Sequence, residues 1–457
     1  MPRGPDAPAR GRRAVEPRTR DARLNDTGLA PRRAALGVLS AVRRGVPLDV
    51  ALDRALLPLP DADRRLTHEL AAGVLRHAQA LDGVLAHFVP RGLGSLSAAL
   101  LDVLRLGAYQ LRILDRVPAH AAVATSVALA RERVGERVSG FTNAVLRRVA
   151  ELPAGAATHD ALSEVEHLAR TWSHPAWLVQ RWLGRFGSAG TAALLAWNNA
   201  RPSLVLQPTR GDVLDLEGLL DEHDIANTPA PYGAGVVVKA SHPERLPGYT
   251  TGEFYVQDPA QALVVRFASF PSTATIYDAC AAPGGKAVGM TGRSTTVIAA
   301  DLSRRRIDRL RENLTRAGQG ASSIVVADAA RPPIRPVRAY LLDAPCLGTG
   351  TFARHPDARG RVTETALQSL VLAQAALLDA AAERIAPGGV LCYATCSLEP
   401  EENEMQISAF LARRRDFERQ PPAVFPRDVV TPAGDLQTLP QRDEIDGAYA
   451  ARLVRVA

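Results

Sequence analysis

The 457-residue sequence is poor in cysteine, lysine and long apolar runs. Its four cysteines are too few for a disulfide framework and lack the C-x-x-C spacing of a zinc site, so we expect no metal and a reducing cytoplasmic setting. No stretch reaches 18 consecutive apolar residues, and the N-terminus lacks the apolar core of a secretory signal, so neither a membrane span nor export is expected. With 46% hydrophobic residues, the chain is typical of a multidomain globular protein.

Arginine supplies almost all of the positive charge. The chain has 53 arginines but only two lysines, Lys239 and Lys286, and a net charge of +7. Residues 1–33 carry nine arginines against four acids. A segment so rich in Pro, Gly and Arg buries too little apolar surface to order itself, so residues 1–28 are predicted to be a disordered basic tail. Such a tail is either a solvated extension or an arm attracted to phosphates.

Residues 29–155 are predicted to form a helical bundle. Apolar residues recur there at intervals of three and four, and Pro47, Pro60 and Pro118 separate the helices. The segment 101–114 is apolar on nearly all sides, which predicts a central helix. Arginines recur near the helix ends; taken singly they are typical of solvated faces, and as a cluster they indicate an RNA-facing surface: Arg32, Arg33, Arg43, Arg44, Arg147 and Arg148.

Residues 156–255 are predicted to be a helical linker followed by a small α+β subdomain. The helical part holds all four tryptophans, for which packing is the more common role than base stacking: Trp172, Trp177, Trp182 and Trp197. Two short β-like runs, 203–207 and 235–239, follow between Pro and Gly turns.

Residues 256–457 show a regular alternation of strand-like and helical segments. Strands are expected at 275–280, 296–301, 323–328, 339–343 and 389–395, which predicts a doubly wound parallel sheet. Four of these strands end at or beside an acid: Asp278, Asp301, Asp328 and Asp343. Ligands of such sheets bind outside the carboxyl ends of the strands, so the four acids predict a binding site there.

The turn after the first of these strands reads Asp278-Ala-Cys-Ala-Ala-Pro-Gly-Gly-Lys286. Its two glycines allow a ligand to approach the backbone closely, and the N–H groups of the following helix point into the same crevice. The G-x-G-x-x-G spacing of NAD and FAD sites is absent. Asp301, at the end of the next strand, is placed to accept hydrogen bonds from ribose hydroxyls. This pattern favours a nucleoside cofactor without pyrophosphate, and S-adenosylmethionine fits.

Two cysteines follow neighbouring strands at the same edge. Cys346 lies in Asp-Ala-Pro-Cys and Cys396 in Ala-Thr-Cys-Ser, whereas Cys280 and Cys392 are expected to be buried. Two thiols beside a methyl donor suit methylation of cytosine at C5, because a thiolate that adds to C6 makes C5 nucleophilic. The C5 proton must then leave and the thiol must be eliminated, which a second thiol can assist. The two motifs alone do not decide which cysteine attacks.

Several segments are similar to known motifs. DACAAPGGK, DAPCLGTG, RHPDARGR and YATCSLEPEEN resemble those of the NOL1/NOP2/Sun family of RNA cytosine-C5 methyltransferases, over about residues 254–456. LGAYQLRILDRVPAHAAV and FTNAVLRRV resemble the NusB-like RNA-binding domain that precedes the catalytic part in the bacterial Sun (RsmB) branch. The resemblance implies a multidomain α and α/β protein: an all-α NusB-like bundle, a small α+β insert and a Rossmann-like methyltransferase over 256–457.

The resemblance also implies roles for individual residues. Cys396 corresponds to the nucleophile and Cys346 to the cysteine needed for product release. Asp301 would lie on the ribose, Asp328 near the adenine, and Asp343 between the methionine end and the reacting base. The remaining S-adenosylmethionine contacts would come from the glycine turn: Cys280, Ala281, Ala282, Pro283, Gly284, Gly285 and Lys286.

Three positions depart from the family pattern: Leu347 stands where Ser is usual, Gly360 replaces a Trp, and Ala448 replaces an aromatic residue. None is expected to touch a reacting group, but an aromatic residue lost near the site removes a surface for base stacking. His355 is a weak candidate for an acid or base, since a loop position beside Arg354 and Asp357 favours local pairing.

The expected function is methylation of one cytosine in 16S rRNA, or in a small-subunit precursor, by a monomeric cytoplasmic enzyme. One alternative is the same chemistry on tRNA or at another rRNA site. A second alternative is a NusB-like RNA-binding assembly factor whose transferase domain is inert, although the presence of both cysteines and all four strand-end acids argues against it.

Overall fold

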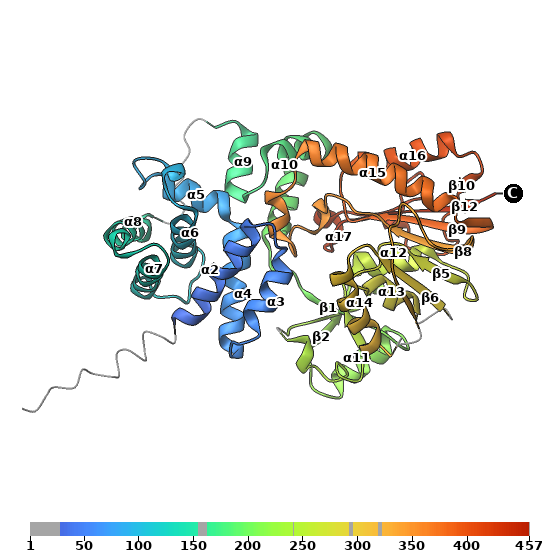
Figure 1. Cartoon of the computed structure of the whole chain (residues 1–457), viewed down its shortest axis with the longest axis horizontal. Coiled ribbons are helices and arrows are strands. Elements are labelled where there is room, and N and C mark those ends of the chain that lie inside the picture. Colours follow the sequence, from blue (N-terminus) through green and yellow to red (C-terminus); the bar gives the residue numbers. More distant parts are fainter. Residues whose placement is uncertain (1–27, 154–161, 241, 292–295, 319–321, 457) are drawn as a thin grey trace, which may run out of the picture. The chain divides into compact units, whose positions relative to one another are not determined.

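The structure is a computed structural model that describes residues 28–153, 162–240, 242–291, 296–318 and 322–456 (Figure 1). The chain divides into two compact units, residues 1–158 and 159–457. The predicted basic tail lies, except for Gly28, outside the described residues, and so does the predicted boundary at 155/156.

The described part of the first unit is helical throughout, as predicted. The helices α3, α4 and α7 each begin directly after a proline, namely Pro47, Pro60 and Pro118. The α6 helix is the most enclosed of them, because Val103, Leu104 and other residues of it are fully buried, which confirms the predicted central helix. The bounds are α2 Leu29–Arg43, α3 Leu48–Leu56, α4 Asp61–Arg76, α5 Ala78–Ala86, α6 Ala98–Arg112, α7 Ala119–Arg133 and α8 Ser139–Glu151.

The arginine cluster of this unit is only partly at the surface. Arg147 and Arg148 are exposed, as expected. Arg32 is 6% exposed, however, and its Nε donates a hydrogen bond of 2.7 Å to Oε1 of the buried Gln110. Burial lowers the pKa of this guanidinium. The expectation of a solvated or RNA-facing Arg32 is therefore wrong: its partner in the core holds it inside the bundle.

The second unit begins with two helices, α9 (Glu164–Trp172) and α10 (Ala176–Asn199). A capping box formed by Ser163 and Glu166 starts α9. Both helices pack into one apolar cluster with residues that follow Cys346 and Cys396 in the sequence, among them Phe352 and Leu398. Trp182 is 1% exposed in this cluster, which confirms packing as its role.

The small subdomain is an antiparallel sheet in the order β2-β3-β1-β4. The two predicted runs are strands β1 (Leu204–Pro208) and β3 (Val236–Val238), and the sheet adds two short strands that sequence patterns did not show, β2 (Asn227–Pro229) and β4 (Phe254–Val256). Helix α11 (Val213–Asp221) starts at Asp212, whose Oδ1 accepts hydrogen bonds from the N–H groups of Leu214 and Asp215.

The large sheet has eight strands, with the main order β10-β12-β9-β8-β5-β6-β7 and β11 paired to β12. The five predicted strands are its parallel part, so the doubly wound α/β fold is confirmed. The antiparallel strands β10, β11 and β12 were not predicted. The bounds are β5 Thr275–Asp278, β6 Thr296–Asp301, β7 Ser323–Val326, β8 Val337–Asp343, β9 Ile385–Thr395, β10 Phe417–Arg419, β11 Leu436–Thr438 and β12 Ala448–Arg455.

Helices cover both faces of this sheet (Figure 1). The helices α12 (Pro259–Ala268), α13 (Gly285–Thr291) and α14 (Arg304–Arg316) pack on one face, and α15 (Glu364–Ala382) and α16 (Glu404–Arg413) on the other. Among the described residues, α15 alone is long and apolar enough for a membrane span by length and composition. Its residues Leu377, Leu378 and Ala381 are buried against the sheet.

Candidate active site

The turn between β5 and α13 forms the first wall of the site. The N–H of Ala281 donates to the carbonyl oxygen of Ala300 at 2.8 Å, which pins the turn to the end of β6. Gly284 has φ +113°, and a Cβ atom there would lie 2.9 Å from Cδ1 of Leu310. The positive φ and the close contact together explain why this position requires glycine.

A cavity of about 360 Å³ lies beside this turn. Among the residues predicted for the cofactor, those that line it are Cys280, Ala281, Ala282, Pro283, Gly285, Lys286 and Asp343. Asp278 also lines it, together with residues that sequence reasoning missed: Tyr249 and Gln257 from the chain before α12, and Arg309, Asn313 and Arg316 from α14. No local motif marks these residues, because they reach the cavity only through the packing of the subdomain and α14.

The other two strand-end acids lie outside the lining of this cavity. Asp301 is buried and accepts hydrogen bonds from the N–H groups of Ser303 at 2.9 Å and Ala282 at 3.3 Å, while Nη1 of Arg306 lies 3.3 Å from its Oδ2. Asp328 is exposed two residues beyond β7. Asp301 therefore remains next to the turn, with Arg306 as a neighbour that the motifs did not indicate.

Two residues of the cavity lining form an ion pair. Nζ of Lys286 donates to Oδ2 of Asp343 at 2.7 Å. Burial lowers the pKa of Lys286, but Asp343, the sulfur of Cys396 and Asp278 more than offset this, so the pKa lies above its ordinary value. Asp278 is fully buried, and burial followed by repulsion from Asp343 raises its pKa to about 8. Among the described residues neither of its oxygens has a well-aligned hydrogen-bond partner, although the N–H of Cys280 is near enough to favour the charged form.

The two cysteines meet at the ends of the neighbouring strands β8 and β9. Sγ of Cys346 lies 3.4 Å from Sγ of Cys396, so the structure brings together the two thiols that the sequence left as equals. The hydrogen bond to Cys396 and burial raise the pKa of Cys346 well above its ordinary value. The raised pKa favours the protonated form of Cys346, and either sulfur can be the donor in the contact between them. Burial raises the pKa of both Cys280 and Cys392 to about 12.

Hydrogen bonds join the two cysteine segments to each other. The N–H of Gly350 donates to the carbonyl oxygen of Cys396 at 2.9 Å, and the N–H of Leu398 donates to Oγ1 of Thr349 at 2.8 Å. The buried carboxylate of Glu402 accepts the N–H of Leu347 at 3.0 Å. The two segments are thus held as one structure, although 50 residues separate their cysteines.

The three residues that depart from the family pattern take no part in the contact between Cys346 and Cys396. Leu347 packs in the apolar cluster with α10 and contributes only its backbone N–H to Glu402. A Cβ atom at Gly360 would meet nothing within 4 Å, and Ala448 is buried in β12.

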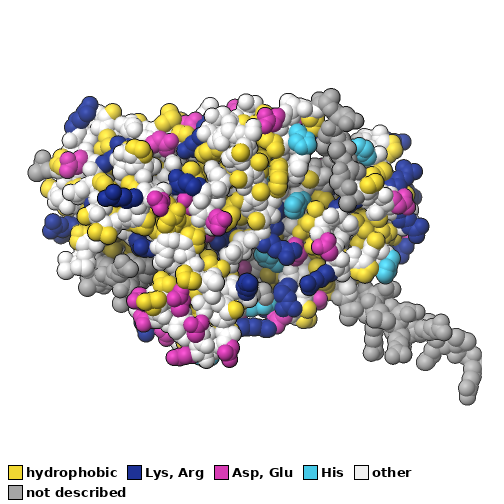
Figure 2. Space-filling view, turned by 180° about the vertical axis from the view of Figure 1, so that it is seen from behind, with side chains coloured by type: hydrophobic (Ala, Val, Ile, Leu, Met, Phe, Trp, Pro, Cys, Tyr) yellow, Lys and Arg dark blue, Asp and Glu magenta, His cyan; other side chains and the backbone are white. Residues whose placement is uncertain are grey.

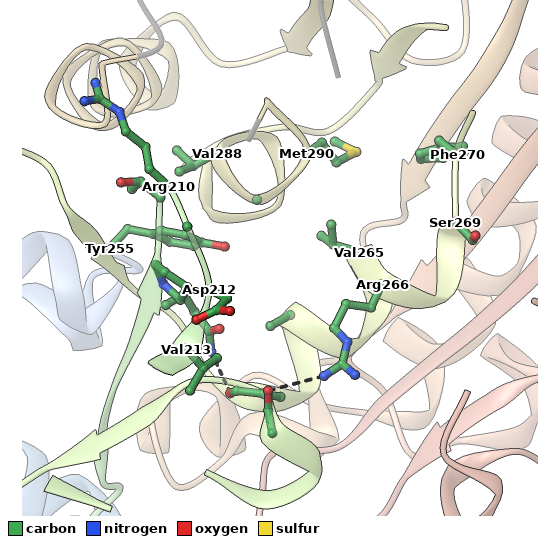
Figure 3. Close-up of a pocket in the computed structure, with 18 of the residues that line it drawn as sticks. Arg210, Asp212, Val213, Tyr255, Val265, Arg266, Ser269, Phe270, Val288 and Met290 are labelled. Atoms are coloured by element: carbon green, nitrogen blue, oxygen red, sulfur yellow. Dashed lines mark hydrogen bonds between the residues drawn. The ribbon is translucent and has the colours of Figure 1, made fainter. Parts of the chain in front are cut away.

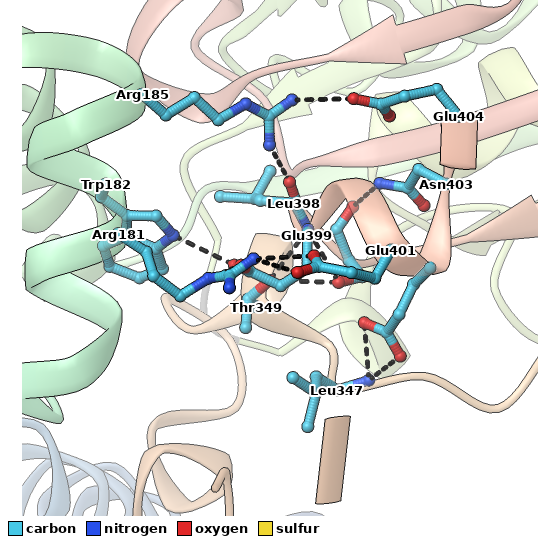
Figure 4. A network of polar contacts seen from close by, with 12 residues as sticks. Arg181, Trp182, Arg185, Leu347, Thr349, Leu398, Glu399, Glu401, Asn403 and Glu404 are labelled. Carbon is cyan, nitrogen blue, oxygen red and sulfur yellow. Dashed lines mark hydrogen bonds and ion pairs between the residues drawn. The ribbon is translucent and has the colours of Figure 1, made fainter. Parts of the chain in front are cut away.

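Helix α10 contacts the segment after Cys396 directly (Figure 4). Nε of Arg181 donates to Glu399 at 2.9 Å and its Nη2 to Glu401 at 2.7 Å, and Nε1 of Trp182 donates to Glu399 at 3.1 Å. These contacts join residues more than 210 positions apart, so no spacing in the sequence could show them.

Arg354 forms ion pairs with two buried acids, Asp258 and Asp446. Its Nη2 lies 2.7 Å from Asp258 and its Nε 2.9 Å from Asp446. Burial, followed by repulsion from Asp258, raises the pKa of Asp446 to about 7. His355 is exposed and does not line the cavity, in line with the weak case for it as an acid or base.

A larger cavity, of about 590 Å³, lies between the small subdomain and the helices α12 and α13 (Figure 3). Arg210, Asp212 and Arg266 are the charged residues of its described lining. It shares only Tyr255 and Val288 with the cavity beside the turn, and none of the described residues lining it is a cysteine. Size therefore does not identify the reactive site here.

Charge on the surface is mixed. On the face shown in Figure 2, dark blue Lys and Arg side chains form several separate groups with acidic side chains between them. Beside the glycine turn, positive charge comes from Arg309 and Arg316, which line the cavity of about 360 Å³.

Comparison with known proteins agrees with both units. A family model described as 16S rRNA methyltransferase RsmB/F matches residues 270–454, and a NusB family model matches residues 29–151. The chain is 34% identical over 433 residues to the probable ribosomal RNA small subunit methyltransferase B of Synechocystis sp., covering 90% of this chain and 96% of the relative. The Pseudomonas putida ribosomal RNA small subunit methyltransferase B is 34% identical over 448 residues, covering 93% and 99%. The chain belongs to the ribosomal RNA small subunit methyltransferase B family.

Solved structures share the fold of this family member. The crystal structure of PH0851 superposes with a TM-score of 0.78 at 23% identity, over 93% of this chain and 98% of that one. NSun6 from Pyrococcus horikoshii with SFG gives a TM-score of 0.54 at 19% identity, over 62% and 98%. The relatives and the family models confirm the predicted resemblance to the Sun (RsmB) methyltransferases, and membership of the family makes the chain an rRNA methyltransferase with a NusB-like helical region.

Proposed function

We propose that this family member methylates C5 of one cytosine in 16S rRNA, using S-adenosylmethionine and a transient covalent bond from Cys396 to C6 of the base. The observation that carries the proposal is the distance of 3.4 Å between the two sulfurs, beside the ion pair of Lys286 and Asp343. A methyltransferase that acted on a nitrogen or an oxygen would have no use for a second thiol at this place.

The residues around the turn suit the cofactor. The carboxyl groups of Asp278 and Asp343 line the cavity, and Asp301 lies beside Ala282 with both oxygens on N–H donors. Acids at these strand ends suit the cationic and hydroxyl groups of S-adenosylmethionine. When bound, the cofactor supplies an electrophilic methyl group.

The environment of the two thiols favours Cys396 as the nucleophile. The raised pKa of Cys346 favours its protonated form, and the sulfur of Cys396 interacts favourably with the ammonium group of Lys286. A cation beside the sulfur suits a nucleophilic cysteine, and Cys396 also occupies the position that the family resemblance implies for the nucleophile. The Cys396 thiolate would add to C6, and the electron pair of the C5–C6 double bond would form the new bond from C5 to the methyl carbon. The bond from the methyl carbon to the sulfonium sulfur would break, and its electron pair would stay on that sulfur as a neutral thioether.

The same pair can complete the reaction. Loss of the C5 proton restores the C5–C6 double bond and expels the sulfur of Cys396. The thiol of Cys346 protonates the departing sulfur and, as a thiolate, takes up the proton lost from C5, so protons and electrons balance. The role of Cys346 in release follows from its position beside Cys396.

The NusB-like unit is proposed to bind rRNA, since a NusB family model matches it. A monomeric enzyme acting in the cytoplasm on 16S rRNA or its precursor is the form proposed here. Methylation of tRNA, or of another rRNA site, is the alternative that the thiol chemistry permits equally.

Mapping of 5-methylcytosine tests the proposal. The purified chain is incubated with labelled S-adenosylmethionine and unmodified 16S rRNA, tRNA or 23S rRNA in separate reactions, followed by bisulfite sequencing. We expect label at one cytosine of 16S rRNA. Label only in another RNA would favour the alternative substrate, and RNA binding without any label would favour the inert assembly factor.

A further inference from the structure

The segment that follows Cys396 contains two buried acids. Glu399 is 1% exposed and Glu402 is fully buried. A carboxylate taken out of water is costly unless it is paired and hydrogen-bonded. The partners of these two acids therefore determine where this segment can lie.

The two acids tie the segment to different parts of the chain. Glu402 accepts the N–H of Leu347 and an N–H of the Gln374 side chain at 2.9 Å, which joins it to the segment that carries Cys346. Glu399 is instead held by α10, through Nε of Arg181 at 2.9 Å and Nε1 of Trp182 at 3.1 Å. The nucleophile segment is thus fixed from two sides.

Helix α10 adds further contacts along the same segment (Figure 4). Nη2 of Arg181 reaches both oxygens of Glu401, at 2.8 and 2.7 Å. Nη1 of Arg185 donates to the carbonyl oxygen of Leu398, two residues after Cys396, and its Nη2 lies 3.8 Å from Glu404. The helix itself is anchored by the buried ring of Trp182, which packs 6.3 Å from the ring of Phe352.

We propose that Arg181 is a positioning residue for Cys396: its pairing with Glu399 and Glu401 holds the segment 396–404 where the two sulfurs stand 3.4 Å apart. This inference rests on the proposed function of Cys396. Without Arg181, the carboxylate of Glu399 keeps, among the described contacts, only the neutral donor Trp182 and is drawn toward water, which moves Leu398 and Cys396. Glu402 continues to hold the Cys346 segment, so the distance between the two thiols changes.

The first test measures that distance without RNA or cofactor. The protein is equilibrated with reduced and oxidised glutathione, where one oxidised glutathione converts the two thiols to a disulfide and gives two reduced glutathione molecules. Mass spectrometry of the Cys346–Cys396 peptide gives the effective concentration of the thiols. We expect Arg181→Ala to lower it at least about tenfold, because alignment is steeply dependent on position.

A matched control separates positioning from a general loss of stability. Nε of Arg419 pairs at 3.1 Å with the buried Asp435, which also has one neutral aromatic donor, the hydroxyl of Tyr449 at 2.6 Å. Arg419→Ala therefore leaves a buried acid with one neutral donor, as Arg181→Ala does, but the arginine that it removes lies on β10 and has no hydrogen bond to α10 or to the segment 396–404 among the described contacts. We expect Arg419→Ala to leave the effective concentration within twofold of the wild type.

The second test measures catalysis. Single-turnover methylation by Arg181→Ala is expected to fall by about 10- to 100-fold, with the Kd for S-adenosylmethionine within twofold. The double variant Arg181→Met with Glu399→Gln should recover most of the rate, because the buried charge is gone while Trp182 keeps an acceptor. If Arg181→Ala does not fold, Arg181→Lys replaces it. Lysine keeps the charge but cannot pair with Glu399 and Glu401 at once through two separate nitrogens, so the rate of methylation should fall by an intermediate amount.

The outcomes separate this inference from the proposed function. An unchanged effective concentration, or a loss of rate no larger than that of Arg419→Ala, would overturn the positioning role. A lowered effective concentration in Arg181→Ala supports it even if the wild type methylates no cytosine, in which case only the proposed function fails.

Discussion

The turn that faces the cofactor and the segments that carry the cysteines lie at the same edge of the sheet but are built differently. The turn is fixed by near neighbours: Ala281 bonds to Ala300, and Gly284 packs on Leu310. The cysteine segments are fixed by distant ones, since Glu399 pairs with Arg181 and Leu347 with Glu402. Binding of the cofactor and alignment of the thiols should therefore respond to different substitutions.

The largest effect is expected from Cys396→Ser. A serine hydroxyl is a far weaker nucleophile than a thiolate, so methyl transfer should fall to background, at least about 1000-fold. The Kd for S-adenosylmethionine, measured by calorimetry, should stay within twofold, because Cys396 does not line the cofactor cavity. Cys392→Ser, at a buried thiol of β9, is the control and should keep most of the activity.

Cys346→Ala tests whether attack on C6 and release of the product depend on different cysteines. The bond from Cys396 to C6 still forms, but elimination is impaired because the proton donor is missing. We expect a protein–RNA adduct that survives denaturing electrophoresis, with multiple turnover lowered about 100-fold. An adduct that forms in Cys396→Ser but not in Cys346→Ala would reverse the two roles.

Gly284→Ala tests the cofactor side of the comparison. The new Cβ meets Leu310 at 2.9 Å in a backbone with φ +113°, a strain of about 2 kcal/mol. The variant should weaken S-adenosylmethionine binding by about tenfold while the glutathione equilibrium of the two thiols stays within twofold. A change in that equilibrium as large as the change in Kd would show that the two regions are not independent.

The last prediction concerns the dependence of stability on pH and involves neither RNA nor cofactor. The pKa of Asp278 is raised from its ordinary value of 3.8 to about 8 in the folded state, so the folded state holds this proton more tightly than the unfolded state. Stability contributed by this group is present below pH 4 and is lost as the pH rises toward 8. Asp278→Asn removes the loss, so without cofactor it should stabilise the protein more at pH 8 than at pH 5, by about 2 kcal/mol or more at about 1.4 kcal/mol per pKa unit. An equal change in unfolding free energy at both pH values would contradict the assignment.

The sequence predicted the parts of the molecule whose cause is local. Prolines before helices, alternating strands and helices, and acids at strand ends gave the helical unit, the parallel strands and most of the cavity lining. The antiparallel strand β12 escaped because its pairing with β9 depends on the tertiary fold. Arg32 was misjudged because an arginine at a helix surface and one that meets a buried Gln110 have the same local pattern.

The candidate site also depends on contacts between residues that are far apart in the sequence. Both cysteines are visible as motifs, and the family resemblance distinguished their roles, but only the fold shows that their sulfurs lie 3.4 Å apart. Arg181 and Arg306 carry no motif of their own, and each is identified only by the acid it meets, Glu399 and Asp301.

The most direct test of the account traps the covalent bond. A 16S rRNA fragment that carries 5-fluorocytidine at the mapped site blocks the last step, because fluorine at C5 does not leave as a proton does. After incubation with S-adenosylmethionine, digestion and mass spectrometry, the account predicts a methylated nucleotide attached to the peptide that contains Cys396. Attachment to the peptide that contains Cys346, or methylation of unmodified RNA with no trapped adduct, would contradict it.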